Sequence, residues 1–153
     1  MARVVRRRRI AAPASALWAV ITDPYHLPRW WPNTHRVENV SESESVERSW
    51  TQVLETRGGR GVRADFRCIE WSDGERYVFE QTVEGTPFER FLRRARTEID
   101  LDPRNGDTEV IMALDRQLRG LSRLGSLMMR RAIGRTLNQA LDGLETVATG
   151  AEG

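Results

Sequence analysis

The sequence of 153 residues contains no lysine, one cysteine and two histidines. All 24 basic residues are therefore arginines, which excludes a Schiff-base lysine and a phosphate-loop lysine. The single Cys68 excludes an internal disulfide and a cysteine-based metal cluster. His26 and His35 follow no spacing rule for a metal site, so we expect neither a metal nor another cofactor.

Long apolar runs are missing as well, and no segment approaches the ~18 apolar residues of a membrane span. The arginines from Arg6 to Arg9, ahead of the moderately apolar stretch 10–21, imitate a secretion signal. Pro13 interrupts that stretch, and Asp23-Pro24 follows where a small-residue cleavage site belongs. We therefore expect a cytoplasmic protein without a membrane span.

Neither a repeat nor a linker rich in proline, glycine and serine divides the chain. Residues 1–149 are expected to form a single domain with one sizeable core, followed by a tail at 150–153. The formal net charge is only +2, and acidic residues are interspersed with basic ones, so binding to nucleic acid is not expected. The protein could form a homodimer, and the sequence does not decide this.

The stretch from Ile10 to Trp31 predicts a strand followed by two short helices. Four apolar residues after Pro13 recur at the spacing of an amphipathic helix: Ala14, Leu17, Trp18 and Ile21. Pro13 suits a helix start, because its missing N–H would be an unpaired donor there. Asp23-Pro24 ends this helix and can cap a second one, which the Trp30-Trp31-Pro32 segment closes.

Alternating apolar residues predict about seven strands joined mostly by hairpins. The strands fall within 4–11, 37–40, 46–54, 62–68, 77–83, 91–101 and 110–114. The Pro103-Arg104-Asn105-Gly106 run predicts a hairpin turn between the last two. One face of such an antiparallel sheet must be covered.

A long helix from Leu121 to Thr149 is predicted to cover that face. Its apolar side consists of Met129, Ile133, Leu137, Ala140, Leu144 and Val147. Leu121, Leu124 and Met128 lie on a different arc, so the first turns rotate away or bend at Gly125. Glycines 125, 134 and 143 each cost about 1 kcal/mol in a helix interior. They indicate either that space is needed or that another backbone packs closely.

This order of elements resembles the START/Bet v 1-like (SRPBCC) superfamily, particularly its bacterial polyketide cyclase/dehydrase-like branch. The matching motifs are Ala12-Pro13, Leu17-Trp18, Asp23-Pro24 and Trp30-Trp31-Pro32. The resemblance covers nearly the whole chain and implies an α+β helix-grip fold, in which a curved antiparallel sheet wraps around the C-terminal helix. It also implies an elongated apolar cavity between sheet and helix. The superfamily hosts lipid carriers, cyclases, hormone receptors and chaperone activators, so the resemblance does not select an activity.

A cavity of that kind is the default site for a hydrophobic small molecule. The residues predicted to bind it are Trp30, Trp50, Gln52, Phe66, Phe79, Gln81, Phe91, Arg93 and Met112. Gln81 and Arg93 are expected to orient a polar end of the ligand. Arg48 and Arg116 also share the parity of inward residues, and a buried guanidinium needs an acidic partner, water or a ligand anion. A bulge that shifts the parity of a strand would instead leave such side chains in solvent.

The four arginines from Arg6 to Arg9 raise a similar question, because alternation sends two of them to each face of a strand. The outward pair is expected in solvent. The inward pair is held by neighbouring carboxylates, lies beyond the core, or forms a clamp for a ligand carboxylate.

Candidate catalytic residues are scarce. Tyr25 and His26 are the candidates for acid/base chemistry on an enolising polyketide, although a surface or capping role fits both. Three functions stay open. We favour a binder of a lipid-like or polyketide-like molecule. The others are a polyketide cyclase, aromatase or dehydratase acting without metal, and a protein-interaction module similar to chaperone activators.

Overall fold

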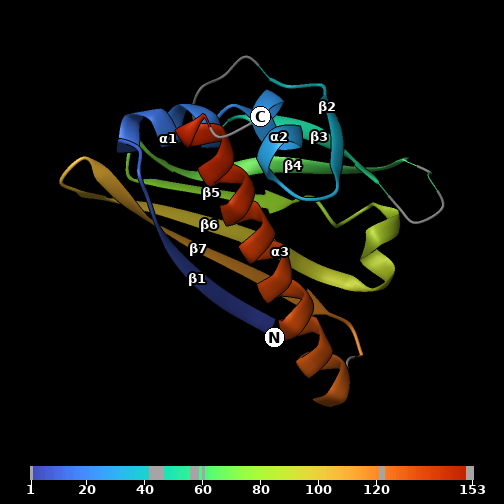
Figure 1. Ribbon diagram of the computed structural model, residues 1–153. Coiled ribbons are helices and arrows are strands. Elements are labelled where there is room, and N and C mark those ends of the chain that lie inside the picture. The colour runs from blue at the N-terminus through green and yellow to red at the C-terminus, as the bar shows by residue number, and fades with distance from the viewer. Residues whose placement is uncertain (1, 42–46, 56–58, 60, 121–122, 151–153) are drawn as a thin grey trace.

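The computed structural model describes residues 2–41, 47–55, 59, 61–120 and 123–150. Within them, seven strands form one antiparallel sheet in the order β1-β7-β6-β5-β4-β3-β2. The strands are β1 (Ala2–Ile10), β2 (Thr34–Glu38), β3 (Ser49–Glu55), β4 (Gly61–Ser72), β5 (Arg76–Gln81), β6 (Leu92–Arg104) and β7 (Asp107–Leu118). The sheet curves along one side of the long helix α3 (Arg123–Thr149), as Figure 1 shows. This is the α+β helix-grip arrangement that the sequence predicts.

Short helices follow β1 and β5. They are α1 (Ala14–Ile21), η1 (Pro24–His26), α2 (Leu27–Trp30) and η2 (Pro87–Arg90). Pro13 immediately precedes α1 with φ −69°, so the predicted helix start is confirmed. Asp23 caps η1, because its Oδ1 accepts a hydrogen bond of 3.0 Å from the Tyr25 N–H. Helices α1 and α2 lie beside the C-terminal half of α3 (Figure 1).

Strand β2 overlaps its predicted range least. We expected residues 37–40, whereas β2 spans Thr34–Glu38 and has a register shift between Thr34 and Arg36. Asn39 follows at φ 53°, a left-handed conformation that asparagine tolerates and that ends the strand. Val46, predicted to lie on the inner face of the third strand, falls outside the described residues.

Helix α3 packs one apolar face onto β1, α1 and α2. Ile133, Leu137, Ala140 and Leu144 are fully buried, as predicted. Leu141 is buried too, which widens the face beyond the predicted stripe. Met128 is 63% exposed, in agreement with its position on a different arc, whereas Leu121 lies outside the described residues. In that described part of the chain, no helix is both long and apolar enough to cross a membrane.

The arginines of β1 divide between the two faces of the sheet. Arg7 forms an ion pair with Glu109 at 3.3 Å, and Arg9 forms one with Asp107 at 3.0 Å. Both carboxylates are on β7, the strand next to β1. Arg8 forms ion pairs with Asp142 and Glu145 of α3. The Arg6 guanidinium lies against Gly134 of α3. The inward pair therefore contacts the helix, and carboxylates of this chain neutralise Arg8.

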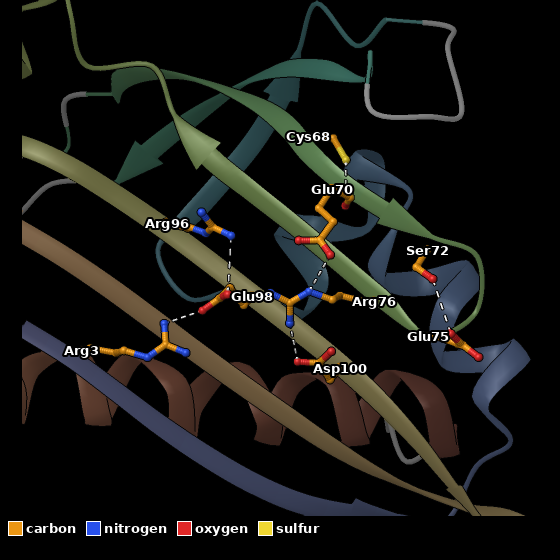
Figure 2. A network of polar contacts seen from close by, with 9 residues as sticks. All are labelled: Arg3, Cys68, Glu70, Ser72, Glu75, Arg76, Arg96, Glu98 and Asp100. Carbon is orange, nitrogen blue, oxygen red and sulfur yellow. Dashed lines mark hydrogen bonds and ion pairs between the residues drawn. The ribbon is translucent and has the colours of Figure 1, made fainter.

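A network of ion pairs covers the face of the sheet that points away from α3 (Figure 2). Arg76 on β5 donates hydrogen bonds to Glu70 at 3.0 Å, Glu98 at 2.6 Å and Asp100 at 2.8 Å. Glu98 also accepts a hydrogen bond from Arg3 on β1. Even-numbered residues of β6 face this side, because the odd-numbered ones from 95 to 101 are buried on the other. The outer arginines in this network thus have carboxylate partners.

Candidate functional site

A cavity of about 750 Å³ lies between the inner face of the sheet, meaning the face toward α3, and the segments that cover it. Strands β3 to β7 supply most of its wall, Thr136 comes from α3, and residues 31–33 come from the loop after α2. The apolar lining includes Trp31, Leu54, Val62, Phe66, Phe79, Phe88, Phe91 and Leu114. Glu55, Arg63 and Phe91 are exposed and form part of its rim. The volume falls within the usual range of small-molecule sites.

The sheet register places a row of inner-face residues across five strands. Trp50 lies opposite Phe66, and Phe66 lies opposite Gln81. Glu80 pairs with Arg96, so the next residues in this antiparallel pair, Gln81 and Ala95, also face each other. Ala95 in turn pairs with Arg116. The row therefore runs from aromatic residues on β3 and β4 to polar residues on β5 and β7, with a small alanine between the polar ones.

Aromatic contacts shape the apolar end of the cavity. Phe66 stacks on Trp50 with ring centroids 5.9 Å apart and an interplanar angle of 8°. Phe79 meets Trp31 at 6.0 Å and Trp50 at 5.4 Å in edge-to-face geometry. Such offset and edge contacts are the favoured arrangements of aromatic rings. They give this end a well-packed apolar wall that can contact an apolar ligand.

The polar lining residues differ in whether their hydrogen-bonding groups have partners within the described part of the chain. Gln52 accepts a 3.0 Å hydrogen bond from the Trp50 indole and donates a 3.2 Å bond to Thr34. Gln81 is 9% exposed, and its Nε2 atom has no hydrogen-bond partner among the described residues. Arg116 likewise forms neither an ion pair nor a hydrogen bond within that part of the chain, and burial lowers the pKa of its guanidinium. Gln52 is therefore structural, whereas Gln81 and Arg116 retain unused donors.

Apart from Arg93, the structure separates the predicted ligand-binding residues into three groups. Those that line the cavity are Gln52, Phe66, Phe79, Gln81 and Phe91. Trp50 is buried directly behind Phe66. Trp30 and Met112 are buried in the core and contribute no lining surface. The neighbouring Trp31 takes the place in the wall that we assigned to Trp30.

Arg93 is the predicted ligand-binding residue whose position differs most clearly from the expected one. It is exposed and absent from the cavity wall, so its expected inward orientation is wrong. The cause is a register shift between Leu92 and Arg94, which inserts an extra residue and reverses parity at the start of β6. Arg116 instead supplies the guanidinium in the wall. The sequence did indicate this orientation, because Arg116 lies two residues after the inward-facing Leu114. Strand β7 pairs with β1 and β6 without a register shift at that point, so the alternation holds there.

The two catalytic candidates lie outside this cavity. Tyr25 is 64% exposed and borders a separate groove beside α1 and Trp71. The His26 ring contacts Arg29 at 3.2 Å, and its other nitrogen lies 3.6 Å from Asp23. None of the four arginines from Arg6 to Arg9 lines the cavity either. In the described residues, no three His, Cys, Asp or Glu side chains gather as metal ligands would.

Comparisons with known proteins agree with this architecture. The family model described as polyketide cyclase / dehydrase and lipid transport matches residues 1–149. The chain belongs to this family. No curated protein matches the sequence.

Solved structures similar to this family member share its fold at low sequence identity. A START superfamily protein from Mycobacterium smegmatis is 14% identical with a TM-score of 0.77, covering 97% of this chain and 98% of its own. A Streptomyces aromatase/cyclase is 16% identical with a TM-score of 0.77, covering 96% and 93%. A di-domain aromatase/cyclase from the steffimycin pathway is 12% identical with a TM-score of 0.78, covering 97% of this chain and 51% of its own. These identities establish the fold and leave the activity to the site itself.

Proposed function

We propose that this protein binds an elongated, largely apolar small molecule, lipid-like or polyketide-like, in the cavity between the sheet and α3. The observation that carries this proposal is a cavity of about 750 Å³ with Phe66, Phe79 and Trp31 in its wall. A pocket of this volume that is lined by aromatic side chains and opens at an exposed rim is the usual form of a small-molecule site. The family description, which includes lipid transport, points in the same direction.

The expected affinity follows from the apolar surface that a ligand would bury. Burial contributes about 25 cal/mol per Å² of apolar surface, so 300 to 400 Å² would give roughly 8 to 10 kcal/mol before the costs of association. Loss of translational and rotational freedom removes several kcal/mol of this. About 4 to 6 kcal/mol then remains, which corresponds to a Kd between tens of micromolar and about 1 mM for a ligand that fills the cavity.

A second candidate is catalysis on a polyketide-like chain without a metal. The family description and the aromatase/cyclase neighbours favour it. On this chain, however, Tyr25 and His26 lie outside the cavity, and its ionisable lining groups are Glu55, Arg63 and Arg116. None of these is a group with an ordinary pKa near neutrality, which acid/base catalysis favours. Binding therefore ranks first.

The third candidate, an interaction module similar to chaperone activators, has weaker support. It would be favoured by a helix packed directly onto the sheet with side chains filling the interior. Instead, an open cavity lies over Gln81, Ala95 and Leu114 on the inner face of the sheet.

The test is a variant that fills the cavity without introducing a charge. Ala95 lies in the wall between Gln81 and Arg116, so Ala95→Phe places a ring into the empty space. We expect it to abolish the fluorescence enhancement of Nile red, an uncharged apolar dye, while the protein keeps its melting temperature. Ala132→Phe, at an exposed position of α3, is the matched control and should bind the dye normally. Equal binding by both variants would place the dye elsewhere and contradict the proposal.

A further inference from the structure

We propose that the cavity recognises the carboxylate of an apolar monocarboxylic acid, held by the Arg116 guanidinium with the Gln81 amide beside it. This inference rests on the proposed function and adds the chemical class of the ligand. Two lining side chains carry it, since both present donors that no described residue of the chain satisfies. Arg116 is half-buried, so its unpaired guanidinium has lost part of its contact with water without gaining a partner, and an anionic ligand would supply that partner.

Neither the carboxylate next to Arg116 in the sequence nor the one in the cavity wall pairs with its guanidinium. Asp115 is adjacent along β7, but successive side chains of a strand point to opposite faces, so Asp115 faces away from the cavity. Glu55 is the one carboxylate among the described lining residues. It lies at the exposed rim, where His35 contacts its Oε1 at 3.1 Å. Arg63, the other lining cation, pairs with Glu38 at 2.9 Å.

The register explains how both donors reach one ligand group. Gln81 on β5 and Arg116 on β7 flank Ala95 on the intervening strand. Neighbouring strands are about 4.8 Å apart, so the backbones of the two residues are separated by about 10 Å. The methyl group of Ala95 leaves the space between their longer side chains open to the cavity. A guanidinium binds a carboxylate through two parallel hydrogen bonds, and an amide N–H can donate another.

The charge and length of the cavity define the ligand further. One unpaired guanidinium balances one negative charge, which favours a monoanion such as a carboxylate over a phosphate dianion. Phe66 lies on the same row at the apolar end, three strand spacings or about 14 Å along the sheet from Arg116. A carboxylate at Arg116 with an apolar tail on the order of 10 Å therefore spans the row. Medium-length fatty acids and polycyclic aromatic carboxylic acids have this shape.

The experiment compares decanoate with decan-1-ol, a pair that differs in charge and has the same chain. Isothermal titration calorimetry at pH 7.5 would give the Kd of each ligand for wild type, Arg116→Met, Arg116→Lys and Arg93→Met. Arg93 is an exposed arginine near the same end of the sheet, outside the cavity wall, and serves as the control. We expect Arg116→Met to raise the Kd for decanoate by about tenfold to a hundredfold, the range that the loss of a charged hydrogen bond gives. The Kd for decan-1-ol should stay unchanged. Arg116→Lys should restore part of the loss, and Arg93→Met should behave as wild type.

A thermal scan of the ligand-free variants separates recognition from a structural role. Removing an unpaired, half-buried charge should keep or raise the melting temperature, so Arg116→Met is expected to be at least as stable as wild type. The inference is overturned if Arg116→Met binds decanoate as wild type does, or if it loses both ligands equally together with stability. Wild type that binds decan-1-ol as tightly as decanoate would refute the carboxylate site and leave the proposed function intact. Wild type that binds neither ligand would refute both.

Discussion

Gly143 of α3 lies directly against the backbone of Trp30 at the end of α2. A Cβ atom on Gly143 would be 2.5 Å from the Trp30 carbonyl oxygen and 2.8 Å from its Cα. Only a residue without a side chain allows this approach. The contact fixes α2 on α3 and thereby positions Trp31, which lines the cavity. Close backbone packing, and not a need for space, explains this glycine.

Gly143→Ala should destabilise the protein although alanine is the better helix former. The gain in helix propensity is about 1 kcal/mol. Backbone atoms of Trp30 cannot move aside cheaply, so overpacking should cost about 1 to 3 kcal/mol beyond that gain. Urea denaturation measures the difference. Gly134→Ala is the control, because its Cβ would meet the Arg6 guanidinium, the far end of a flexible side chain, and should be tolerated. Equal losses for both variants would contradict this interpretation.

Leu137→Ala should remove a central part of the core. Leu137 is fully buried on the face of α3 that packs on the sheet, whereas Arg135 is exposed. Truncation of a buried leucine costs about 2 to 5 kcal/mol, and an exposed arginine typically less than about 0.5 kcal/mol. Thermal denaturation of Leu137→Ala and Arg135→Ala should therefore show a large decrease only for the first. Similar decreases would mean that another face of α3 is buried.

Glu98 should make stability depend on pH in the acid range. Burial alone would raise the pKa of Glu98, but hydrogen bonds from Arg3 and Arg76 outweigh it and hold the pKa below its ordinary value. A carboxyl with a lowered pKa stabilises the fold above its unfolded pKa of about 4.3, and this contribution is lost as pH falls through the folded pKa. Glu98→Gln should lower the free energy of unfolding at pH 7 by about 1 to 2 kcal/mol.

The pH arm of that experiment uses urea denaturation of both proteins at pH 7 and below pH 4. The difference between wild type and Glu98→Gln should shrink at the lower pH, because the stabilisation from ionised Glu98 is lost as the pH falls through its lowered folded-state pKa. A difference that stays constant with pH would show that the loss arises from packing.

The spacing of apolar residues and the residues that start or end helices and strands predicted the fold well, because both depend only on neighbours along the chain. The apolar repeat at Ile133, Leu137 and Leu144 is a property of one helix, and Pro13 marks a helix start by its own chemistry. The shift at β2 and the bulge before Arg94 depend on how two strands pair. Parity counted along a single strand cannot reveal such a bulge.

The candidate site was predictable only where strands are regular. Gln52 and Gln81 have the same sequence signal, a polar residue among inward apolar ones. Trp50 and Thr34 satisfy Gln52, whereas no described partner satisfies the amide nitrogen of Gln81. That difference arises from tertiary contacts. Whether Gln81 and the other predicted lining residues bind a ligand stays a prediction.

The most direct test of binding inside the cavity is a titration of the ¹⁵N-labelled protein with decanoate, followed by amide chemical shifts. We predict that the largest changes cluster on Phe66, Ala95 and Thr97, whose side chains line the cavity, and that Leu127 and Met128 on the exposed start of α3 stay unchanged. Absence of shifts at millimolar decanoate, or shifts confined to Leu127 and Met128, would contradict an internal binding site.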